Sequence, residues 1–203
     1  MTTKTASKNG KAVEAVISIP RIDIREMELS LTGDTALICH AWSDKAKKMM
    51  LAKQMKEAKP GREAKNPKQD YEDSIYRLED GTPGFPAVAF KQAAVGACRF
   101  VKGDIKMTEA RGAFHVQGEL IPIEGEPSMR EDMVRIGMGV ADIRYRAEFK
   151  EWSVTLLVKY NSAALSPAQI INLFNIAGFG VGVGEWRPEK SGSYGMFHVE
   201  VSE

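Results

Sequence analysis

The chain has few of the residues on which thiol and metal chemistry depend. Only two of its 203 residues are cysteines, Cys39 and Cys98, and only three are histidines. The cysteines show neither C-x-x-C spacing nor another arrangement typical of a zinc or redox site. Ten methionines beside so few cysteines are typical of a reducing compartment. We therefore expect a cytoplasmic protein that holds no metal ion and no cofactor.

Charge of one sign and long apolar runs are lacking too. The 28 Lys and Arg residues and 27 Asp and Glu residues give a net charge of +1, so overall charge provides no argument for a nucleic-acid ligand. No apolar run approaches the roughly 20 residues that span a bilayer, and we expect no membrane partner. Residues 1–12 are polar, which predicts a disordered tail and no secretory signal, followed by one domain over residues 13–203.

Motifs of catalysis are missing as well. The sequence has no H-E-x-x-H or D-x-D spacing, no G-x-S-x-G turn and no Walker loop. His40 and His198 lie in or beside strand patterns, where a histidine is typically a packed or edge residue. The residues by themselves therefore predict no catalytic site.

The last third of the sequence predicts a sheet covered by a helix. An apolar residue stands at every second position of one run, as in a strand with one buried face: Trp152, Val154, Leu156, Val158 and Tyr160. Ser166–Gln169 follows as a capping box with proline at the first helical position, and we expect Gly178 to end that helix in a left-handed conformation. Together with the closing strand pattern at residues 194–201, this order predicts an α+β fold with a ferredoxin-like or RRM-like antiparallel sheet, helices on one face, and insertions.

Weaker patterns predict the other elements. A strand over residues 15–31 is expected to point Ile22, Ile24, Met27, Leu29 and Leu31 inward. Further strands are predicted at residues 35–42, 113–123 and 134–149, with a turn at residues 124–131. Helices are predicted at residues 43–58, with Ala46, Met49, Met50 and Met55 on the apolar side, and at residues 85–101. Residues 60–70, which contain two prolines, are predicted to be an exposed loop.

Positive charge concentrates in one segment of the chain. Between Lys45 and Lys68 there are nine Lys or Arg residues and two Asp or Glu residues. We interpret residues 43–70 as a basic helix-loop insertion that closes over a phosphate backbone. The alternative is a helix whose lysines are only solvated. The candidate contacts in this segment are Lys47, Lys48, Lys53, Lys56, Arg62 and Lys65.

The segment GFGVGVGEWRPEKSGSYG has six glycines in 18 residues. One interpretation is structural, because glycine permits positive φ and the close approach of another backbone. The other is a binding loop, in which free backbone N–H groups and cations contact phosphates while aromatic rings stack on bases. The candidate residues of the loop are Gly182, Gly184, Trp186, Arg187, Lys190 and Tyr194. Trp42 adds a stacking ring, and Lys91 and Arg99 form a basic stripe on the second predicted helix.

Two motifs resemble a known family. In Gly178–Val201 the pattern Gly-x-Gly-x-Gly, a polar stretch, then aromatic-Gly-x-Phe-x-Val resembles the C-terminal glycine-rich loop of the RAMP superfamily, the RRM-like RNA-binding proteins of CRISPR effector complexes. GFPAVAFKQAAVGACR, at Gly84–Arg99, resembles the family's segment in which a proline, small residues and a lysine open an alanine-rich helix. The family's Gly-Ser-Ser-like turn is replaced here by residues 87–89, Ala-Val-Ala. The resemblance implies an RRM-like core, a single-stranded RNA or DNA ligand, and side-by-side assembly along it.

The sequence thus predicts a non-catalytic, sequence-tolerant protein that binds single-stranded nucleic acid, RNA ahead of DNA, as a homo-oligomer or in a nucleoprotein complex. Two alternatives stay open. One is a viral or plasmid-encoded interaction protein that mimics or blocks a nucleic-acid-handling complex. The other follows from the resemblance: a metal-independent RNA-processing nuclease in which His40 or His198 exchanges a proton with a ribose hydroxyl.

Overall fold

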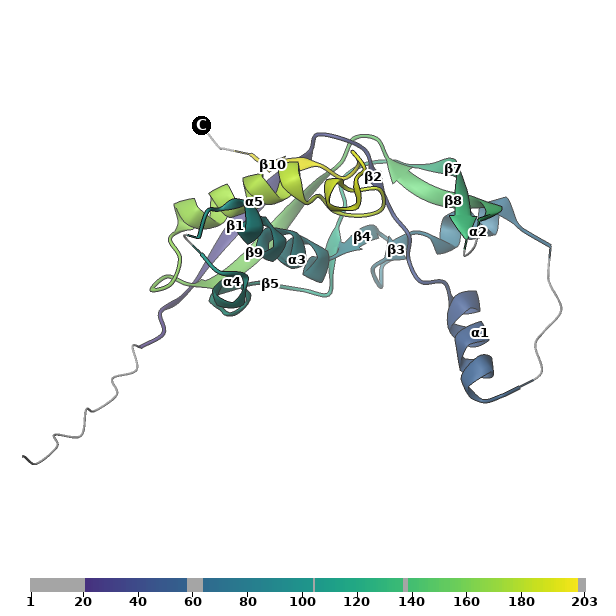
Figure 1. Cartoon of the computed structure of the whole chain (residues 1–203), viewed down its shortest axis with the longest axis horizontal. Coiled ribbons are helices and arrows are strands. Elements are labelled where there is room, and N and C mark those ends of the chain that lie inside the picture. The colour runs from purple at the N-terminus through teal and green to yellow at the C-terminus, as the bar shows by residue number, and fades with distance from the viewer. Residues whose placement is uncertain (1–20, 58–63, 104, 137–138, 201–203) are drawn as a thin grey trace, which may run out of the picture.

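Antiparallel sheets and packed helices make up the chain, in a computed structural model that describes residues 21–57, 64–103, 105–136 and 139–200 (Figure 1). The predicted tail at residues 1–12 lies outside these ranges. The strands are β1 (Ile24–Gly33), β2 (Leu37–Ile38), β3 (Tyr76–Arg77), β4 (Pro83–Pro86), β5 (Phe114–Val116), β6 (Leu120–Pro122), β7 (Pro127–Ile136), β8 (Val140–Phe149), β9 (Ser153–Asn161) and β10 (Phe197–Val199). The helices are α1 (Asp44–Gln54), α2 (Pro67–Asp73), α3 (Ala87–Ala97), α4 (Met107–Ala113) and α5 (Pro167–Gly180), with short 3-10 turns η1 (Cys98–Phe100) and η2 (Pro188–Lys190).

The central sheet has four antiparallel strands in the order β10-β1-β9-β5. Its strands and the helices α3 and α5 follow one another along the chain as β1, α3, β5, β9, α5 and β10, which is the β-α-β-β-α-β order of a ferredoxin-like motif. Figure 1 shows α3 and α5 on the same side of this sheet. The predicted α+β class is confirmed.

The core lies between the central sheet and these helices. The alternating residues Val154, Leu156, Val158 and Tyr160 of β9 are all buried, and the positions between them are more exposed. Phe114 of β5 packs against Phe174 of α5 with ring centroids 5.9 Å apart. Burying a phenylalanine side chain stabilises a fold by about 1.5–3 kcal/mol, so the covered face of this sheet holds the two helices in place.

The predicted strand over residues 15–31 is described only from residue 21 onward, since residues 15–20 lie outside the described ranges. Its described part is strand β1. It covers Ile24–Gly33 and buries Leu29 and Leu31, whereas Ile22 and Ile24 are exposed, so the inward prediction is wrong for these two. The predicted strand at residues 35–42 is reduced to β2. The predicted helix at residues 85–101 is α3, with strand β4 in front of it and a 3-10 turn behind it.

A long hairpin, β7–β8, extends the fold beyond the central sheet, with β2 paired to its second strand. A turn is predicted at residues 124–131, but residues 127–131 form the first half of β7, so the prediction is wrong for them. The reason is exposure: Met129 and Met133 of β7 are 53% and 70% exposed. A strand without a deeply buried face lacks the apolar alternation that identifies a strand. A third sheet has the order β3-β4-β6.

We name residues 43–70 the lysine segment, and it differs from its prediction in two respects. Helix α1 starts where expected, with the Ser43 hydroxyl accepting a hydrogen bond from the Ala46 N–H at 3.2 Å, but it has no buried residue. Met49, Met50 and Met55, expected to face a core, are 55%, 51% and 63% exposed. The predicted loop at residues 60–70 contains the start of α2, which Asn66 caps. Residues 58–63, including Arg62, lie outside the described ranges.

Helix α5 begins at its predicted capping box but ends later than predicted. Its last residue is Gly180, so Gly178 is a helical residue and not a left-handed cap. Glycine is needed there for another reason: a Cβ at Gly178 would lie 1.7 Å from the carbonyl oxygen of Phe197. The missing side chain lets β10 run directly against the helix.

Substituting Gly178 by Ala should therefore destabilise the fold. The overlap involves backbone, which no rotamer change relieves, and we expect the free energy of unfolding to fall by about 3 kcal/mol. Gly112→Ala is the matched control, because a Cβ at this helical glycine of α4 meets no atom within 4 Å. That variant should gain up to about 1 kcal/mol. Urea unfolding of both variants checks the pair, and equal stabilities would contradict the close approach.

Candidate nucleic-acid interface

A groove runs between helices α3 and α4 and the loop that follows α5. We name residues 181–196 the glycine loop and this cavity, of about 570 Å³, the glycine groove. Five residues predicted from sequence line it: Lys91, Arg99, Gly182, Gly184 and Arg187. They come from two separate parts of the chain, residues 91–99 and residues 182–187, which the fold brings together.

The glycine loop is shaped by close backbone contacts. Gly182 and Gly184 have φ of +69° and +78°, which ordinary residues rarely adopt. A Cβ at Gly195 would lie 1.8 Å from the Val183 carbonyl oxygen. The N–H of Val183 donates to the Gly195 carbonyl at 2.9 Å and the N–H of Gly195 donates to the Ala36 carbonyl at 2.8 Å. The structural interpretation of these glycines is thus correct.

The glycine loop has fewer free backbone N–H groups than predicted. Gly182 N–H donates to the Ala177 carbonyl at 2.8 Å, so it has no hydrogen left for a phosphate. Tyr194 N–H is also taken, by the Trp186 carbonyl at 3.1 Å. What the loop offers to a ligand is therefore mainly its side chains.

Two arginines and one carboxylate form a bridge across the groove. Arg99 Nη2 lies 2.8 Å from Glu189 Oε1, and Arg187 Nε and Nη2 lie 3.1 and 2.9 Å from Glu189 Oε2. Burial raises the pKa of Glu189, but the hydrogen bonds from Arg187 and Arg99 outweigh it and the net shift is downward. Glu189 was not singled out from sequence, since the pairing joins residues 90 positions apart.

A second polar contact at the groove joins Lys91 to a histidine. Lys91 Nζ lies 2.9 Å from His115 Nδ1, which joins α3 to the neighbouring strand β5. Burial lowers the pKa of Lys91. Arg111 of α4 completes the cations that line the groove. Sequence reasoning missed Arg111, although the spacing of Met107 and Arg111, four residues apart, would put both on one face of a helix.

The remaining predicted residues of the loop do not line the groove. Trp186 has φ of +56° and is 43% exposed, and Lys190 is exposed. Tyr194 is only partly exposed, and the Arg130 guanidinium lies over its ring, 4.6 Å from the centroid. One face of that ring is therefore taken by a residue of the hairpin, which removes the stacking role expected for that face.

The lysine segment lies apart from the groove. Figure 1 shows α1 projecting away from the sheet and its covering helices. Lys47 pairs with Asp44 at 3.0 Å and lies 5.9 Å from the Trp42 ring, while Lys65 pairs with Asp142 of β8. Lys48, Lys53 and Lys56 are exposed. Trp42 and Lys65 line a second cavity of about 330 Å³, which shares no lining residue with the glycine groove.

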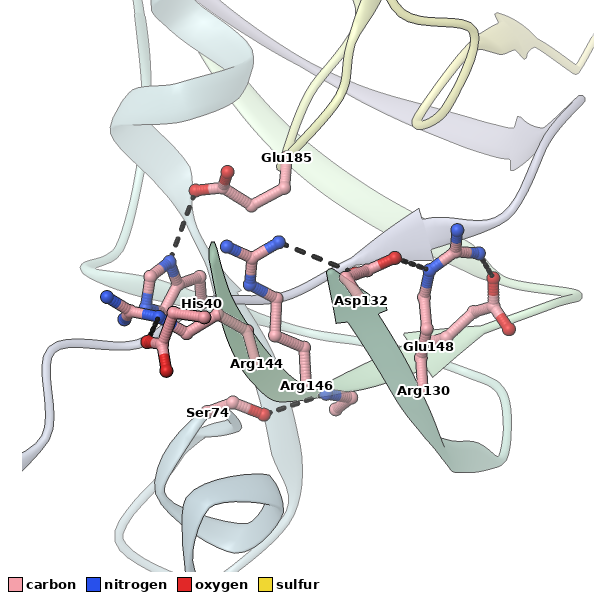
Figure 2. A network of polar contacts seen from close by, with 10 residues as sticks. His40, Ser74, Arg130, Asp132, Arg144, Arg146, Glu148 and Glu185 are labelled. Carbon is pink, nitrogen blue, oxygen red and sulfur yellow. Dashed lines mark hydrogen bonds and ion pairs between the residues drawn. The ribbon is translucent and has the colours of Figure 1, made fainter. Parts of the chain in front are cut away.

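A polar network connects the glycine loop with the hairpin. Figure 2 shows the Arg146 guanidinium between Glu185 and Asp132, with Asp132 3.5 Å away. Arg130 pairs with both Asp132 at 2.8 Å and Glu148 at 2.6 Å. Glu185 lies 3.4 Å from His40. Arg146 Nε is buried without a hydrogen-bond partner in the described part of the chain, so this network is incompletely satisfied.

Comparison with known proteins gives structural neighbours only. No family model matches the chain, and no curated protein matches it. Cmr6 from Pyrococcus furiosus is one similar solved structure, with 9% identity, a TM-score of 0.45, and coverage of 89% of this chain and 100% of that one. A Type III-B Cmr-beta complex bound to cognate target RNA contains another, with 11% identity, a TM-score of 0.45, and coverage of 87% and 60%.

Two further findings concern only the described residues: none of their helices is long and apolar enough to cross a membrane, and no three His, Cys, Asp or Glu side chains are grouped as metal ligands.

The Glu185–His40 contact makes a testable contribution to acid stability. The hydrogen bond from His40, aided by the nearby Arg146 charge, holds the pKa of Glu185 below its ordinary value. Such a group stabilises the fold fully above its unfolded pKa of about 4.3, and this stabilisation is lost as the pH falls through the lower folded value. Glu185→Gln should therefore reduce the free energy of unfolding near neutral pH, with a difference from wild type that shrinks toward about pH 3. Urea unfolding across this range measures it, and a difference independent of pH would refute the assignment.

Proposed function

We propose that the chain binds single-stranded nucleic acid, RNA ahead of DNA, along the glycine groove, and does so without cleaving it. The observation that carries the proposal is the set of cations in one open groove. Lys91, Arg99, Arg111 and Arg187 line it from different elements, and Glu189 is the one carboxylate among the described lining residues. Phosphate charge supplies most of the affinity of non-specific nucleic-acid binding, so a cationic groove in a nearly neutral protein is a fitting site.

The start of α3 adds to the attraction for phosphate. No side chain caps this helix, whose N-cap is Pro86, and Val88 and Ala89 of its first turn line the groove. The N-terminal end of a helix carries partial positive charge and unpaired N–H groups that favour anions. The N-terminal end of α3 therefore adds its positive potential to that of the cationic side chains in the groove.

Bases would be held by apolar and aromatic surface. Val88, which is 56% exposed, and the partly exposed Met107 line the groove, and Trp186 is exposed next to Arg187. Stacking on an aromatic ring is worth about 1–3 kcal/mol per base and tolerates any sequence. The preference for RNA, the membership in a nucleoprotein complex and the side-by-side assembly are proposed from the family resemblance of the two motifs. We also propose that the lysine segment is an insertion in a single domain and a second contact for the strand.

Removal of a groove cation should weaken binding more than removal of a lysine on α1. Arg111→Ala and Lys91→Ala are expected to lower affinity for labelled single-stranded RNA about 3- to 10-fold, or roughly 0.7–1.4 kcal/mol. Each should also flatten the salt dependence by about 0.7 in the log–log slope, because one phosphate contact is lost. Lys48→Ala removes an exposed lysine of α1 for comparison and should cost less affinity than either groove variant. Fluorescence anisotropy at several salt concentrations measures all three. Loss with Lys48→Ala alone would move the site to α1.

One observation favours a second function, an RNA-cleaving site. The local sequence shows no catalytic partner next to a histidine. In the structure, however, Lys91 Nζ lies 2.9 Å from His115 Nδ1, beside the groove. If neutral Lys91 accepts the hydrogen bond from the Nδ1–H, Nε2 is left unprotonated and can take the proton of a ribose 2′-hydroxyl, while that oxygen attacks the adjacent phosphorus and the 5′-oxygen leaves with a proton from water. Burial, which lowers the pKa of Lys91, favours this neutral form of the lysine.

An RNA cleavage assay distinguishes the nuclease from the non-catalytic binder. The nuclease requires that RNA be cut in the presence of a metal chelator, that a 2′-deoxy residue at the cut site block the reaction, and that His115→Ala abolish it while the strand still binds. His198→Ala is the control, because His198 pairs with Asp34 at 2.6 Å on another part of the sheet. Intact RNA after prolonged incubation with wild type contradicts the nuclease and agrees with the non-catalytic proposal.

A further inference from the structure

Glu189 occupies the position that a phosphate group would take between two arginines. Its two carboxylate oxygens are divided between them, Oε1 to Arg99 at 2.8 Å and Oε2 to Arg187 at 2.9 and 3.1 Å. The two oxygens of a carboxylate and the two non-bridging oxygens of a phosphodiester present similar acceptors and the same charge to a guanidinium. The interaction already has the form of a bound anion.

Backbone carbonyls hold both guanidinium groups independently of Glu189. Arg99 Nε donates to the Gly96 carbonyl at 3.1 Å, and Arg187 Nη1 donates to the Gly184 carbonyl at 3.1 Å. An arginine has five N–H donors, so each keeps donors for another acceptor. The site would therefore keep its shape if the carboxylate left.

A ligand can reach this place from solvent. The side chains of Arg99, Arg187 and Glu189 are 48%, 31% and 30% exposed. Exposed ion pairs of this kind are weak, at about 0–1 kcal/mol, and a strand that delivers several phosphates at once can compete with one. Glu189 lies on the short turn η2, next to Ser191 with φ of +62°, and not inside a long helix.

We propose that Arg99 and Arg187 form a binding site for one phosphodiester group of a single strand, and that Glu189 occupies the site in the free protein and is displaced when the strand binds. The inference rests on the proposed nucleic-acid function and deepens it, since it assigns a position to one phosphate. It implies that Glu189 opposes binding although it forms ion pairs within the site.

Glu189→Gln is the variant that tests the site. Removing the charge should raise affinity for a single strand of about 16 nucleotides roughly fivefold, and should steepen the log–log salt dependence by about 0.7, because the carboxylate no longer offsets the one phosphate bound at this site. Glu185→Gln is the control, because it removes the same charge from the same loop outside the groove; we expect a change of less than about twofold for this single, partly exposed charge. Anisotropy titrations over a salt series give both quantities.

A double-mutant cycle adds a result that a structural role of Glu189 would not produce. Arg99→Ala should cost little affinity in wild type, where Arg99 is occupied by Glu189, and clearly more in the Glu189→Gln background. A strand with neutral methylphosphonate linkages should show no gain from Glu189→Gln. If Glu189 only holds the loop in shape, Glu189→Gln weakens binding or leaves it unchanged, and the inference is overturned.

The inference and the proposed function fail in different ways. If wild type binds the strand and Glu189→Gln binds no tighter, the phosphate site is wrong while the function stands. If neither protein binds RNA or DNA, both are wrong. Binding by Glu189→Gln alone supports the inference, because the carboxylate then blocks the site completely.

Discussion

The glycine loop lies so close to its neighbours that several of its positions have no room for a side chain. A Cβ at Gly192 would be 1.7 Å from the Trp186 carbonyl oxygen, and one at Gly184 would be 2.7 Å from that of Ile38. Hydrogen bonds such as Glu185 N–H to the Ile38 carbonyl, 3.1 Å, join the loop to the residues around β2. This backbone packing fixes where Arg187 and Glu189 stand, and so fixes one wall of the glycine groove.

The glycine loop contacts both the helices beside the groove and the β7–β8 hairpin. On one side it faces α3, η1 and α4, which supply Lys91, Arg99 and Arg111 respectively. On the other side Glu185 lies close to His40 (Figure 2), and the Arg130 guanidinium of the hairpin lies over the Tyr194 ring. A displacement of the loop would therefore be felt both in the groove and in the hairpin network. Helix α1, by contrast, has no buried residue.

Local patterns in the sequence predicted the central fold well. The alternation in β9 and the capping box of α5 depend on neighbouring residues alone, and both were found as predicted. The first half of β7 was missed because it buries too little to leave a periodic pattern. Helices α2 and α4 were missed because each has only 7 residues, too few for a helical period to be recognised. The candidate site was predicted in part, through Lys91, Arg99 and Arg187. Arg111 and Glu189 depend on tertiary packing, and the placement of the lysine segment away from the groove depends on it too.

The central claim, that a strand lies in the glycine groove, is tested most directly by mapping photo-crosslinks from a single-stranded RNA that carries photoreactive uridines along its length. Mass spectrometry then identifies the peptides that carry nucleotide adducts. The account predicts adducts on the glycine loop and on α3, around Trp186 and Lys91. Adducts confined to α1 and the second cavity, around Trp42, would contradict it.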